Sequence, residues 1–349
     1  MGLPEPRQPL DCGFCGLGLG GEFRPRRTAS RLPTRTVPPM SAAVSLRTSM
    51  PLAACPCCGE STRKPYVRTR DFHYGLAGEF STMRCSGCGL VFMDPMPSVA
   101  DLATLYPEDY YSFQPPRLQP AWRRFVKRWL GLQRYTYVPH FAKPGRMLDL
   151  GCGSGEYLLE MKDRGWEVYG SELSTAAAEA GRRSGLDIRS GELRAAGFPD
   201  AYFDFVRLNH SLEHIPNPLD VLPEVRRVLK PGGRLFIGVP NVDGLWARLF
   251  GRYWWYLTLP VHAFQYSPSN LTRLLERTGF RTLEVRYNSD AGGNLGSLQL
   301  WLKRNSAKPA DGALVRSIPL RSLATAISKL VDLVRMGDCM EIIATRADV

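Results

Sequence analysis

The segment with the most specific chemistry is a glycine-rich turn, Asp149-Leu-Gly-Cys-Gly-Ser-Gly155, at the end of a short apolar run. Glycine lets a backbone turn tightly and approach a ligand closely, because no Cβ stands in the way. Between a strand and a helix, such a turn lies at the carboxyl end of a parallel sheet, where these sheets bind ligands. The three glycines at 151, 153 and 155 therefore predict a small-molecule site at the end of the first strand.

Acidic residues near this turn indicate what kind of ligand it takes. A dinucleotide site would carry a third glycine at position 156, but Glu156 stands there and puts negative charge where a phosphate would lie. Glu172 follows the next predicted strand and can accept hydrogen bonds from two ribose hydroxyls. Glu192 follows the third strand, as expected of a residue near an adenine amino group. The pattern predicts a ligand with a ribose and without phosphate.

Alternating strands and helices must position these side chains. The predicted strands cover residues 147–150, 167–170, 187–189, 203–208, 234–239, 281–287 and 340–344. Helices are expected after the glycine turn, after Ser174, from Asn217 to the Leu-Lys-Pro-Gly-Gly segment, and after Ser267. Because strands and helices alternate, we predict an α/β fold with a mainly parallel sheet covered on both faces.

Five segments together resemble class I S-adenosylmethionine-dependent methyltransferases. They are residues 149–155, Ser171–Ser174, residues 203–209, Leu212-Glu-His-Ile-Pro216 and Arg227-Val-Leu-Lys-Pro-Gly-Gly233. The chain is similar to the ubiquinone-biosynthesis O-methyltransferases and related bacterial enzymes over residues 143–290 and the final strand. The resemblance implies a three-layer, Rossmann-like, seven-stranded sheet whose last strand is antiparallel, with S-adenosyl-L-methionine as the cofactor. It also implies eight cofactor-binding residues: Asp149, Gly151, Gly153, Gly155, Glu172, Leu173, Glu192 and Asn209.

Histidines beyond the fourth strand are the candidates for a general base. S-adenosylmethionine carries an activated methyl group, so the protein mainly aligns the acceptor and, for a hydroxyl, helps to remove its proton. His210 and His214 flank Glu213 at the mouth of the expected cofactor cleft. His262 lies in the long connection after the fifth strand, next to an aromatic cluster. We predict that His210, His214 and His262 are the catalytic residues.

The sequence of the loop that holds Glu213 differs from that of the equivalent loop in similar enzymes. In the quinone O-methyltransferases the equivalent loop reads Glu-x-x-Glu-His and can hold a divalent cation. Here His210 replaces the first glutamate, and Mg²⁺ prefers oxygen ligands, so a Mg²⁺ site is not expected. A base role for His210 is one interpretation. In the other, Glu213 and His214 only fix the loop through hydrogen bonds.

Two cysteine pairs, Cys55/Cys58 and Cys85/Cys88, have the C-x₂-C spacing, and each pair is followed by glycine. Four thiolates suit a closed tetrahedral Zn²⁺ site, and a module of about 45 residues needs such a cross-link to fold. We predict a small N-terminal zinc ribbon over residues 51–97 in which the metal is structural. Cys57 is an extra thiol that could compete as a ligand.

The remaining segments precede and follow this ribbon. Residues 1–50 are rich in Gly, Pro, Arg and Ser and are predicted to be disordered; Met40 and Met50 are alternative starts of translation. Residues 98–142 are predicted to form a helical linker. Its basic amphipathic helix at 122–135 either packs on the next domain or lies on an anionic membrane.

Residues 143–349 are the predicted methyltransferase domain, and one of its connections is unusually aromatic. Eight aromatic residues stand between 246 and 266. We predict that the segment 244–266 is a lid over a flat or apolar acceptor. The alternative is a hydrophobic cover on the edge of the sheet.

Composition narrows the function classes. With 349 residues, 44% hydrophobic and 22% charged, the chain can form a packed core, which excludes wholesale disorder. It lacks an apolar run that could span a membrane and a secretory signal, so we expect a cytoplasmic protein. The net charge of +12 is spread too evenly to predict a nucleic-acid partner.

These patterns predict an S-adenosylmethionine-dependent methyltransferase that acts on a small-molecule acceptor. The acceptor is either a sugar or glycan precursor or an isoprenoid or phenolic hydroxyl, free or linked to a lipid or a nucleotide. An RNA or ribosome methyltransferase is the first alternative, although the chain has no Asn-Pro-Pro-Tyr motif and no basic stripe with interleaved aromatics. A non-catalytic S-adenosylmethionine-binding protein is the second.

Overall fold

The structure, a computed structural model, describes residues 52–99, 101, 116, 120, 122, 141, 143–306, 309–310 and 312–347. The disordered segment predicted for residues 1–50 lies outside the described residues. So do most of the predicted linker at 98–142 and the amphipathic helix within it. Among the helices that the described residues form, none is both long enough and apolar enough to cross a membrane.

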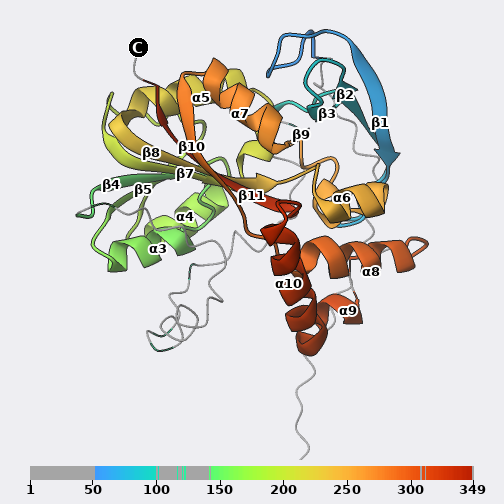
Figure 1. Cartoon of the computed structure of the whole chain (residues 1–349). Coiled ribbons are helices and arrows are strands. Elements are labelled where there is room, and N and C mark those ends of the chain that lie inside the picture. Colours follow the sequence, from blue (N-terminus) through green and yellow to red (C-terminus); the bar gives the residue numbers. More distant parts are fainter. Residues whose placement is uncertain are drawn as a thin grey trace, which may run out of the picture. The chain divides into compact units, whose positions relative to one another are not determined.

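A seven-stranded sheet in the order β10-β11-β8-β7-β4-β5-β6 forms the centre of the fold (Figure 1). Strands β4, β5, β6, β7 and β8 pair in parallel, whereas β11 is antiparallel to both β8 and β10. The predicted α/β sheet of seven strands with an antiparallel last strand is confirmed. The strands are β4 Arg146–Leu150, β5 Glu167–Glu172, β6 Asp187–Ser190, β7 Phe203–Asn209, β8 Leu229–Pro240, β10 Phe280–Tyr287 and β11 Cys339–Arg346.

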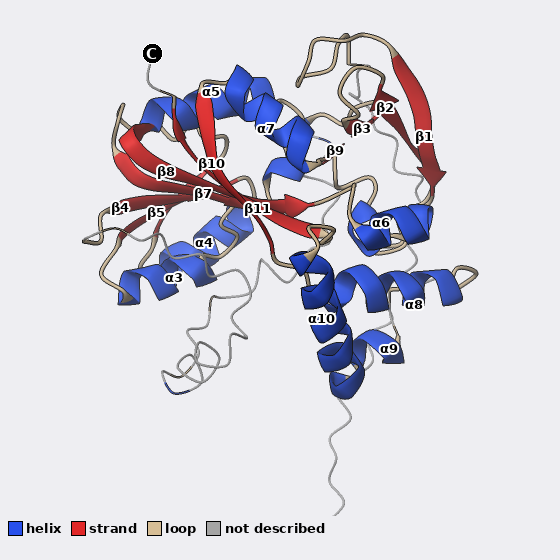
Figure 2. Ribbon diagram, in the orientation of Figure 1, coloured by secondary structure: helices blue, strands red, loops and turns tan. Residues whose placement is uncertain are grey.

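Helices cover both faces of this sheet (Figure 2). Helices α3 (Glu156–Asp163) and α4 (Thr175–Arg183) lie on one face, and α5 (Pro218–Val228) and α7 (Pro268–Arg277) lie on the other. Ser174 caps α4 as its residue type suggests, because its side chain accepts a hydrogen bond from the Ala177 N–H. Ser267 and Asn270 form a capping box at the start of α7.

One predicted boundary is confirmed and another differs from the structure. Helix α5 begins after Asn217 as predicted, with Asn217 at the N-cap position, although its side chain makes no cap hydrogen bond. Strand β8 begins at Leu229, directly after α5, so the Leu-Lys-Pro-Gly-Gly segment belongs to the strand rather than to the helix end. The pairing of β7 with β8 shifts in register between Phe203 and Phe205, and this irregularity accommodates the Pro-Gly-Gly residues.

Apolar side chains of the parallel strands pack alternately above and below the sheet. Val206 and Ile237 belong to one buried cluster, and their neighbours Phe205 and Phe236 belong to another. This period of two is what a strand buried on both faces requires. Both layers are buried from water, so the polar ends of the strands are where a ligand can bind.

A second, smaller sheet contains the predicted ribbon and one strand from far along the chain. Its order is β1-β2-β3-β9, with β1 Arg63–Thr69, β2 Phe80–Cys85, β3 Val91–Met93 and β9 Phe264–Gln265. All its pairings are antiparallel, and the Met93 N–H also donates to the Ala263 carbonyl at 2.9 Å. The fourth strand comes from the segment after β8, which ties the ribbon to the larger domain.

The C-terminal part adds helices after β10. In Figure 1, α10 lies beside α8 and α9. Buried polar contacts join α10 to a π-helical turn, since the Asn294 side chain donates to the Ala324 carbonyl at 2.7 Å. The remaining helical elements are η2 Leu212–His214, α6 Leu245–Phe250, η3 Gly251–Tyr253, η4 Trp255–Leu257, η5 Gly292–Gly296, α8 Ser297–Leu302, α9 Ala313–Arg316 and α10 Ile318–Leu333.

Candidate active site

The glycine turn joins β4 to α3, as its sequence suggests. Gly151 has a φ of 75° and donates its N–H to the Ser171 carbonyl of β5 at 2.8 Å. Gly155 has a φ of 87°, and a Cβ there would lie 2.4 Å from Leu186 Cδ1. Both positions exclude side chains for steric reasons, because a positive φ and a tight neighbour each disfavour an L-residue. The turn therefore presents bare backbone at the carboxyl end of β4.

Glu172, the last residue of β5, is held by this turn. Its Oε2 accepts the Gly153 N–H and its Oε1 accepts the Ser174 N–H, both at 2.8 Å. Burial raises the pKa of Glu172, and the backbone hydrogen bonds oppose that rise. Each carboxylate oxygen has a further lone pair, so the group can accept more hydrogen bonds without moving.

The Asp149 carboxylate forms a buried ion pair with another residue of the sheet. Arg207 of β7 donates through Nη1 to both carboxylate oxygens of Asp149 at 2.9 Å, and Asp149 is only 1% exposed. Burial raises the pKa of Asp149, whereas the Arg207 charge lowers it. The pair links the ends of β4 and β7. Arg207 is a site residue that was not predicted, although an arginine inside the apolar run 203–208 was a visible signal.

The other predicted cofactor residues end neighbouring strands. Leu173 is 48% exposed directly after β5, and Glu192 is exposed two residues after β6. Asn209 ends β7, where its Oδ1 lies 2.6 Å from the place that a Cβ on Gly238 would take. Because these strands are parallel, their carboxyl ends share one edge of the sheet with the glycine turn.

Glu213 and His210 meet just beyond β7. The Glu213 side chain is 1% exposed, and its Oε1 lies 3.3 Å from His210 Nδ1. Burial opposes ionisation of Glu213, but the His210 hydrogen bond and the neighbouring imidazoles hold its pKa below the usual range. His210 has a φ of 51°, a strained conformation for a residue with a Cβ, and its N–H donates to the Gly238 carbonyl at 2.8 Å. Such strain is concentrated at functional positions in proteins.

His214 and His262 complete this cluster, although they are 48 residues apart in sequence and belong to different loops. The two rings lie 4.6 Å apart, centroid to centroid, at 82°. His214 Nδ1 is 3.0 Å from the Val261 carbonyl, and His262 Nδ1 is 2.8 Å from the Tyr256 carbonyl. Burial lowers the pKa of both imidazoles, that of His262 to about 3. At neutral pH the cluster therefore contains an anionic carboxylate and two neutral imidazoles.

The four cysteines of the two C-x₂-C pairs meet in the ribbon. Their Sγ atoms lie within 4.8 Å of one another, with 3.5 Å for Cys55–Cys88 and for Cys58–Cys85. Sulfur atoms around a tetrahedral Zn²⁺ with bonds of about 2.3 Å are about 3.8 Å apart, so the donor set fits. Hydrogen bonds to Cys55 and Cys88 raise the pKa of the buried Cys57 thiol far above its usual range.

The aromatic segment 244–266 packs against both the ribbon and the C-terminal helical part, where the Trp255 N–H donates to Ser297 Oγ at 2.9 Å. Its residues Trp254, Leu257 and Val261 form one buried cluster with Phe80 and Met93 of the small sheet. This packing buries the apolar side chains of the segment within the protein. That the segment also covers an acceptor stays a prediction.

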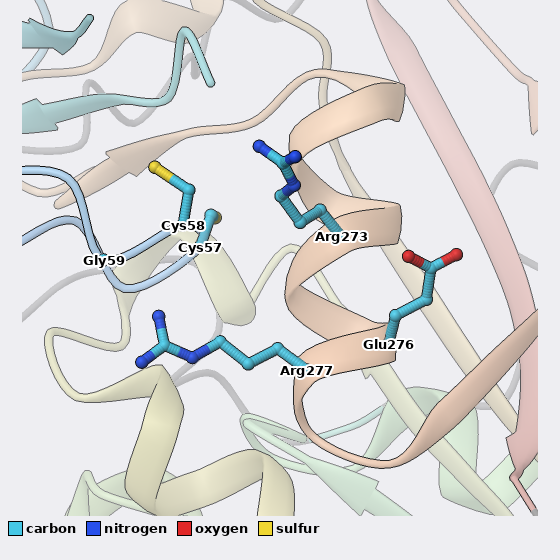
Figure 3. Close-up of a pocket in the computed structure, with 6 residues that line it drawn as sticks. All are labelled: Cys57, Cys58, Gly59, Arg273, Glu276 and Arg277. Atoms are coloured by element: carbon cyan, nitrogen blue, oxygen red, sulfur yellow. The ribbon is translucent and has the colours of Figure 1, made fainter. Parts of the chain in front are cut away.

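A shallow pocket of about 430 Å³ lies between the first cysteine knuckle and α7 (Figure 3). Arg273 and Arg277 of α7 extend toward the knuckle, and Arg277 donates to the Pro56 carbonyl at 3.0 Å. The other lining residues are Cys57, Cys58, Gly59 and Glu276. It contains no residue of the predicted catalytic or cofactor sets. The two guanidinium groups stand beside a cysteine cluster that is anionic when it holds Zn²⁺.

The region that forms this edge is similar to known proteins. Residues 117–285 match the family described as a methyltransferase domain. Demethylmenaquinone methyltransferase of Listeria monocytogenes is 27% identical over 208 residues, which cover 51% of this chain and 82% of that protein. Ubiquinone biosynthesis O-methyltransferase of Burkholderia pseudomallei is 29% identical over 162 residues, covering 42% and 69%.

Solved structures include similar chains as well. A SAM-dependent methyltransferase from Archaeoglobus fulgidus superposes with a TM-score of 0.43 at 23% identity, covering 64% of this chain and 94% of that one. The family match, the relatives and the seven-stranded sheet together define the class: the chain is a class I methyltransferase. Its methyl donor is S-adenosylmethionine, and the predicted enzyme class is confirmed.

Proposed function

We propose that this enzyme transfers the methyl group of S-adenosylmethionine to a hydroxyl oxygen of a small-molecule acceptor. The observation that carries the proposal is the Glu172 carboxylate, which two backbone N–H groups hold beside the glycine turn. A carboxylate so fixed can accept both ribose hydroxyls of the cofactor without an entropic cost for ordering its side chain.

The other predicted cofactor residues each have a role in this proposal. Gly151, Gly153 and Gly155 let the backbone approach the ligand. Leu173 covers the adenosine with its exposed side chain, and Glu192 accepts from the adenine amino group. Asn209 contacts the cofactor from the end of β7. Asp149 acts through its ion pair with Arg207, which keeps the ends of β4 and β7 together.

His210 is the proposed general base among the three candidate histidines. Its side chain is 24% exposed, whereas Glu213 behind it is buried and anionic. When the acceptor hydroxyl attacks the methyl carbon, His210 Nε2 takes the hydroxyl proton, and Glu213 stabilises the resulting imidazolium through Nδ1–H. His214 and His262 line the same site and are fixed by backbone carbonyls. They shape the wall of the site rather than remove the acceptor's proton.

The names of two relatives support a small-molecule acceptor. One is a demethylmenaquinone methyltransferase and the other a ubiquinone biosynthesis O-methyltransferase. The proposed acceptor class is therefore an isoprenoid-type phenol or a sugar or glycan precursor. A lipid-linked or nucleotide-linked form of either acceptor is compatible with the basic composition of the chain.

We also propose that Cys55, Cys58, Cys85 and Cys88 hold a structural Zn²⁺. The support is the donor set: four sulfurs converge, and four protein ligands leave no open position for a reactant. The metal then stabilises the small sheet that carries β9 and the nearby histidine cluster.

Labelled methyl transfer tests the proposed function. The purified protein is incubated with isotopically labelled S-adenosylmethionine and fractions of a host extract, and labelled products are identified by mass spectrometry. We expect label in a small molecule and none in RNA. His210→Gln should abolish the product while cofactor affinity, measured by calorimetry, stays unchanged. Label only in RNA would support the nucleic-acid alternative, and cofactor binding without any product would support the non-catalytic one.

A further inference from the structure

We propose that Glu213, His214 and His262 form a second metal site, for a divalent first-row transition ion. The site lies apart from the four cysteines and leaves out His210, which the proposed mechanism uses as the base. Its third ligand, His262, comes from the segment 244–266 rather than from the loop after β7. Metal binding there would fasten that segment to the edge of the large sheet.

Proximity is the first argument for the site. One ligand atom from each of the three residues lies within 4.8 Å of the other two. Three atoms bound to one ion at about 2.0–2.2 Å would be about 3.3–3.6 Å apart. An ion therefore requires each pair to close by at most about 1.5 Å, which side-chain rotation can supply.

The state of the carboxylate is the second argument. Glu213 is 1% exposed, and among the described residues its Oε2 has no hydrogen-bond partner. An anionic oxygen in that position costs free energy unless a cation or a donor faces it. The Oε1 atom is used by His210, so Oε2 is the oxygen available to an ion.

The orientation of the imidazoles is the third argument. A carbonyl can only accept, so His214 and His262 both donate through Nδ1, to Val261 and Tyr256 respectively. This tautomer puts the lone pair on Nε2. Imidazoles that bind metals in proteins characteristically donate their other ring N–H to a backbone carbonyl or carboxylate, which fixes tautomer and ring orientation. Burial also disfavours the protonated imidazoles, which could not bind a metal.

The donor set selects the kind of ion. Two neutral imidazoles and one carboxylate suit Zn²⁺, Fe²⁺ or Co²⁺, whereas Mg²⁺ and Ca²⁺ prefer oxygen ligands throughout. Three protein ligands also leave a coordination position open. The cysteine site differs on both counts, because it offers four sulfurs and is closed. Only the catalytic use of such an open position rests on the proposed function; binding of the ion does not.

Cobalt uptake tests the inference without an activity assay. Full-length protein loaded with a single equivalent of Zn²⁺, which the four cysteines take up, is titrated with Co²⁺. Bound metal is measured by elemental analysis after desalting and by absorption spectroscopy. We expect one equivalent of Co²⁺ beyond the zinc, with d–d bands but without the thiolate-to-cobalt charge transfer that cysteine ligands produce. Excess Mg²⁺ should not displace it.

Variants locate the bound ion. His262→Gln and the isosteric Glu213→Gln should each weaken Co²⁺ binding by more than the roughly 10–100-fold that loss of an outer hydrogen-bond partner costs. His73→Gln is the matched control, because His73 also bonds a backbone carbonyl, that of Trp255, at 2.9 Å but lies outside the cluster. The inference is overturned if the wild-type protein takes up no cobalt beyond the zinc, if thiolate bands appear, or if Mg²⁺ displaces the cobalt. Unchanged cobalt affinity in either folded ligand variant would also overturn it.

Discussion

Glu172 and Glu213 are two carboxylates at the same edge of one sheet, but their surroundings differ in kind. Glu172 is held by two backbone N–H groups, and burial raises its pKa. Glu213 is surrounded by imidazoles, which lower its pKa despite burial. The first is arranged to accept hydrogen bonds from neutral hydroxyls. The second is arranged to face positive charge, whether an imidazolium or a metal ion.

The difference shows that the two halves of the site depend on different parts of the chain. The cofactor half is built from residues 146–209, which form the four consecutive strands β4 to β7 of the large sheet. The histidine half depends on the segment 244–266 and, through β9, on the ribbon. Damage to one half should therefore leave the other largely intact, which the following experiments examine.

Cys85→Ser should have the largest effect. Structural Zn²⁺ contributes about 10–16 kcal/mol to the folding of small zinc modules, so loss of one of the four ligands should release the metal and loosen β3 and β9. We expect metal analysis to show one zinc fewer than in the wild type and hydrogen exchange to accelerate at residues 263–266. Cofactor affinity should change little. Cys57→Ser is the control and should retain zinc, since the four-cysteine set does not include it.

Asp149→Asn should have the next largest effect, now on the cofactor half. Removing one partner of a buried ion pair costs about 3–5 kcal/mol, because the Arg207 charge is left uncompensated. Urea denaturation should show this loss, together with weaker cofactor binding and unchanged zinc content. Glu284→Gln breaks the exposed pair with Arg286 and should cost no more than about 1 kcal/mol. Equal losses in both variants would contradict the assignment of Asp149 to a buried pair.

Glu172→Ala should weaken cofactor binding by about 1–3 kcal/mol, the cost of losing hydrogen bonds to a charged group. Calorimetric titration with S-adenosylmethionine measures this change. Metal content in the cysteine site and cobalt uptake at the histidine cluster should not change, because Glu172 touches neither. If the variant bound the cofactor as tightly as the wild type does, the proposal that Glu172 binds the ribose hydroxyls would be wrong.

Because its pKa is raised, Glu172 should make both cofactor affinity and the free energy of unfolding depend on pH, in opposite directions. As the pH falls, cofactor affinity should begin to decline above the usual glutamate pKa of about 4.3, because the carboxyl takes up its proton early. The contribution of Glu172 to the free energy of unfolding should instead fall as the pH rises through this range, since the unfolded chain releases the proton first. Glu172→Gln should remove both dependences.

Glu192→Gln should have the smallest effect. Glu192 is exposed after β6, so a hydrogen bond from it to adenine competes with water. We expect a loss of cofactor affinity of no more than about 1 kcal/mol and no change in stability. A loss larger than that of Glu172→Ala would mean that the main anchor of the nucleoside is the third strand rather than the second.

The elements near the cofactor were predictable because their signals are local. The strand before Gly151, the cap at Ser174 and the helix start at Ser267 all lie within a few residues of what they determine. The seven-stranded sheet followed from alternating patterns and from resemblance. The cysteine spacing also predicted the converging sulfur atoms, since both knuckles have the same local turn.

The contacts that escaped prediction join distant parts of the chain. No pattern indicates that His262 meets His214, because the approach depends on how residues 254–261 pack against the ribbon. The two-residue strand β9 is too short to give an alternating signal. The ion pair of Asp149 with Arg207 was missed for the same reason, since the partners are 58 residues apart.

The pairing of β9 with β3 bears on how this protein can be dissected. A fragment that starts at residue 143 would keep every strand of the large sheet but would leave β9, Trp254 and Phe264 uncovered. An unpaired strand edge flanked by aromatic side chains promotes self-association. Catalytic fragments made without the cysteine module should therefore precipitate or form aggregates, and the two modules should be inherited and engineered together.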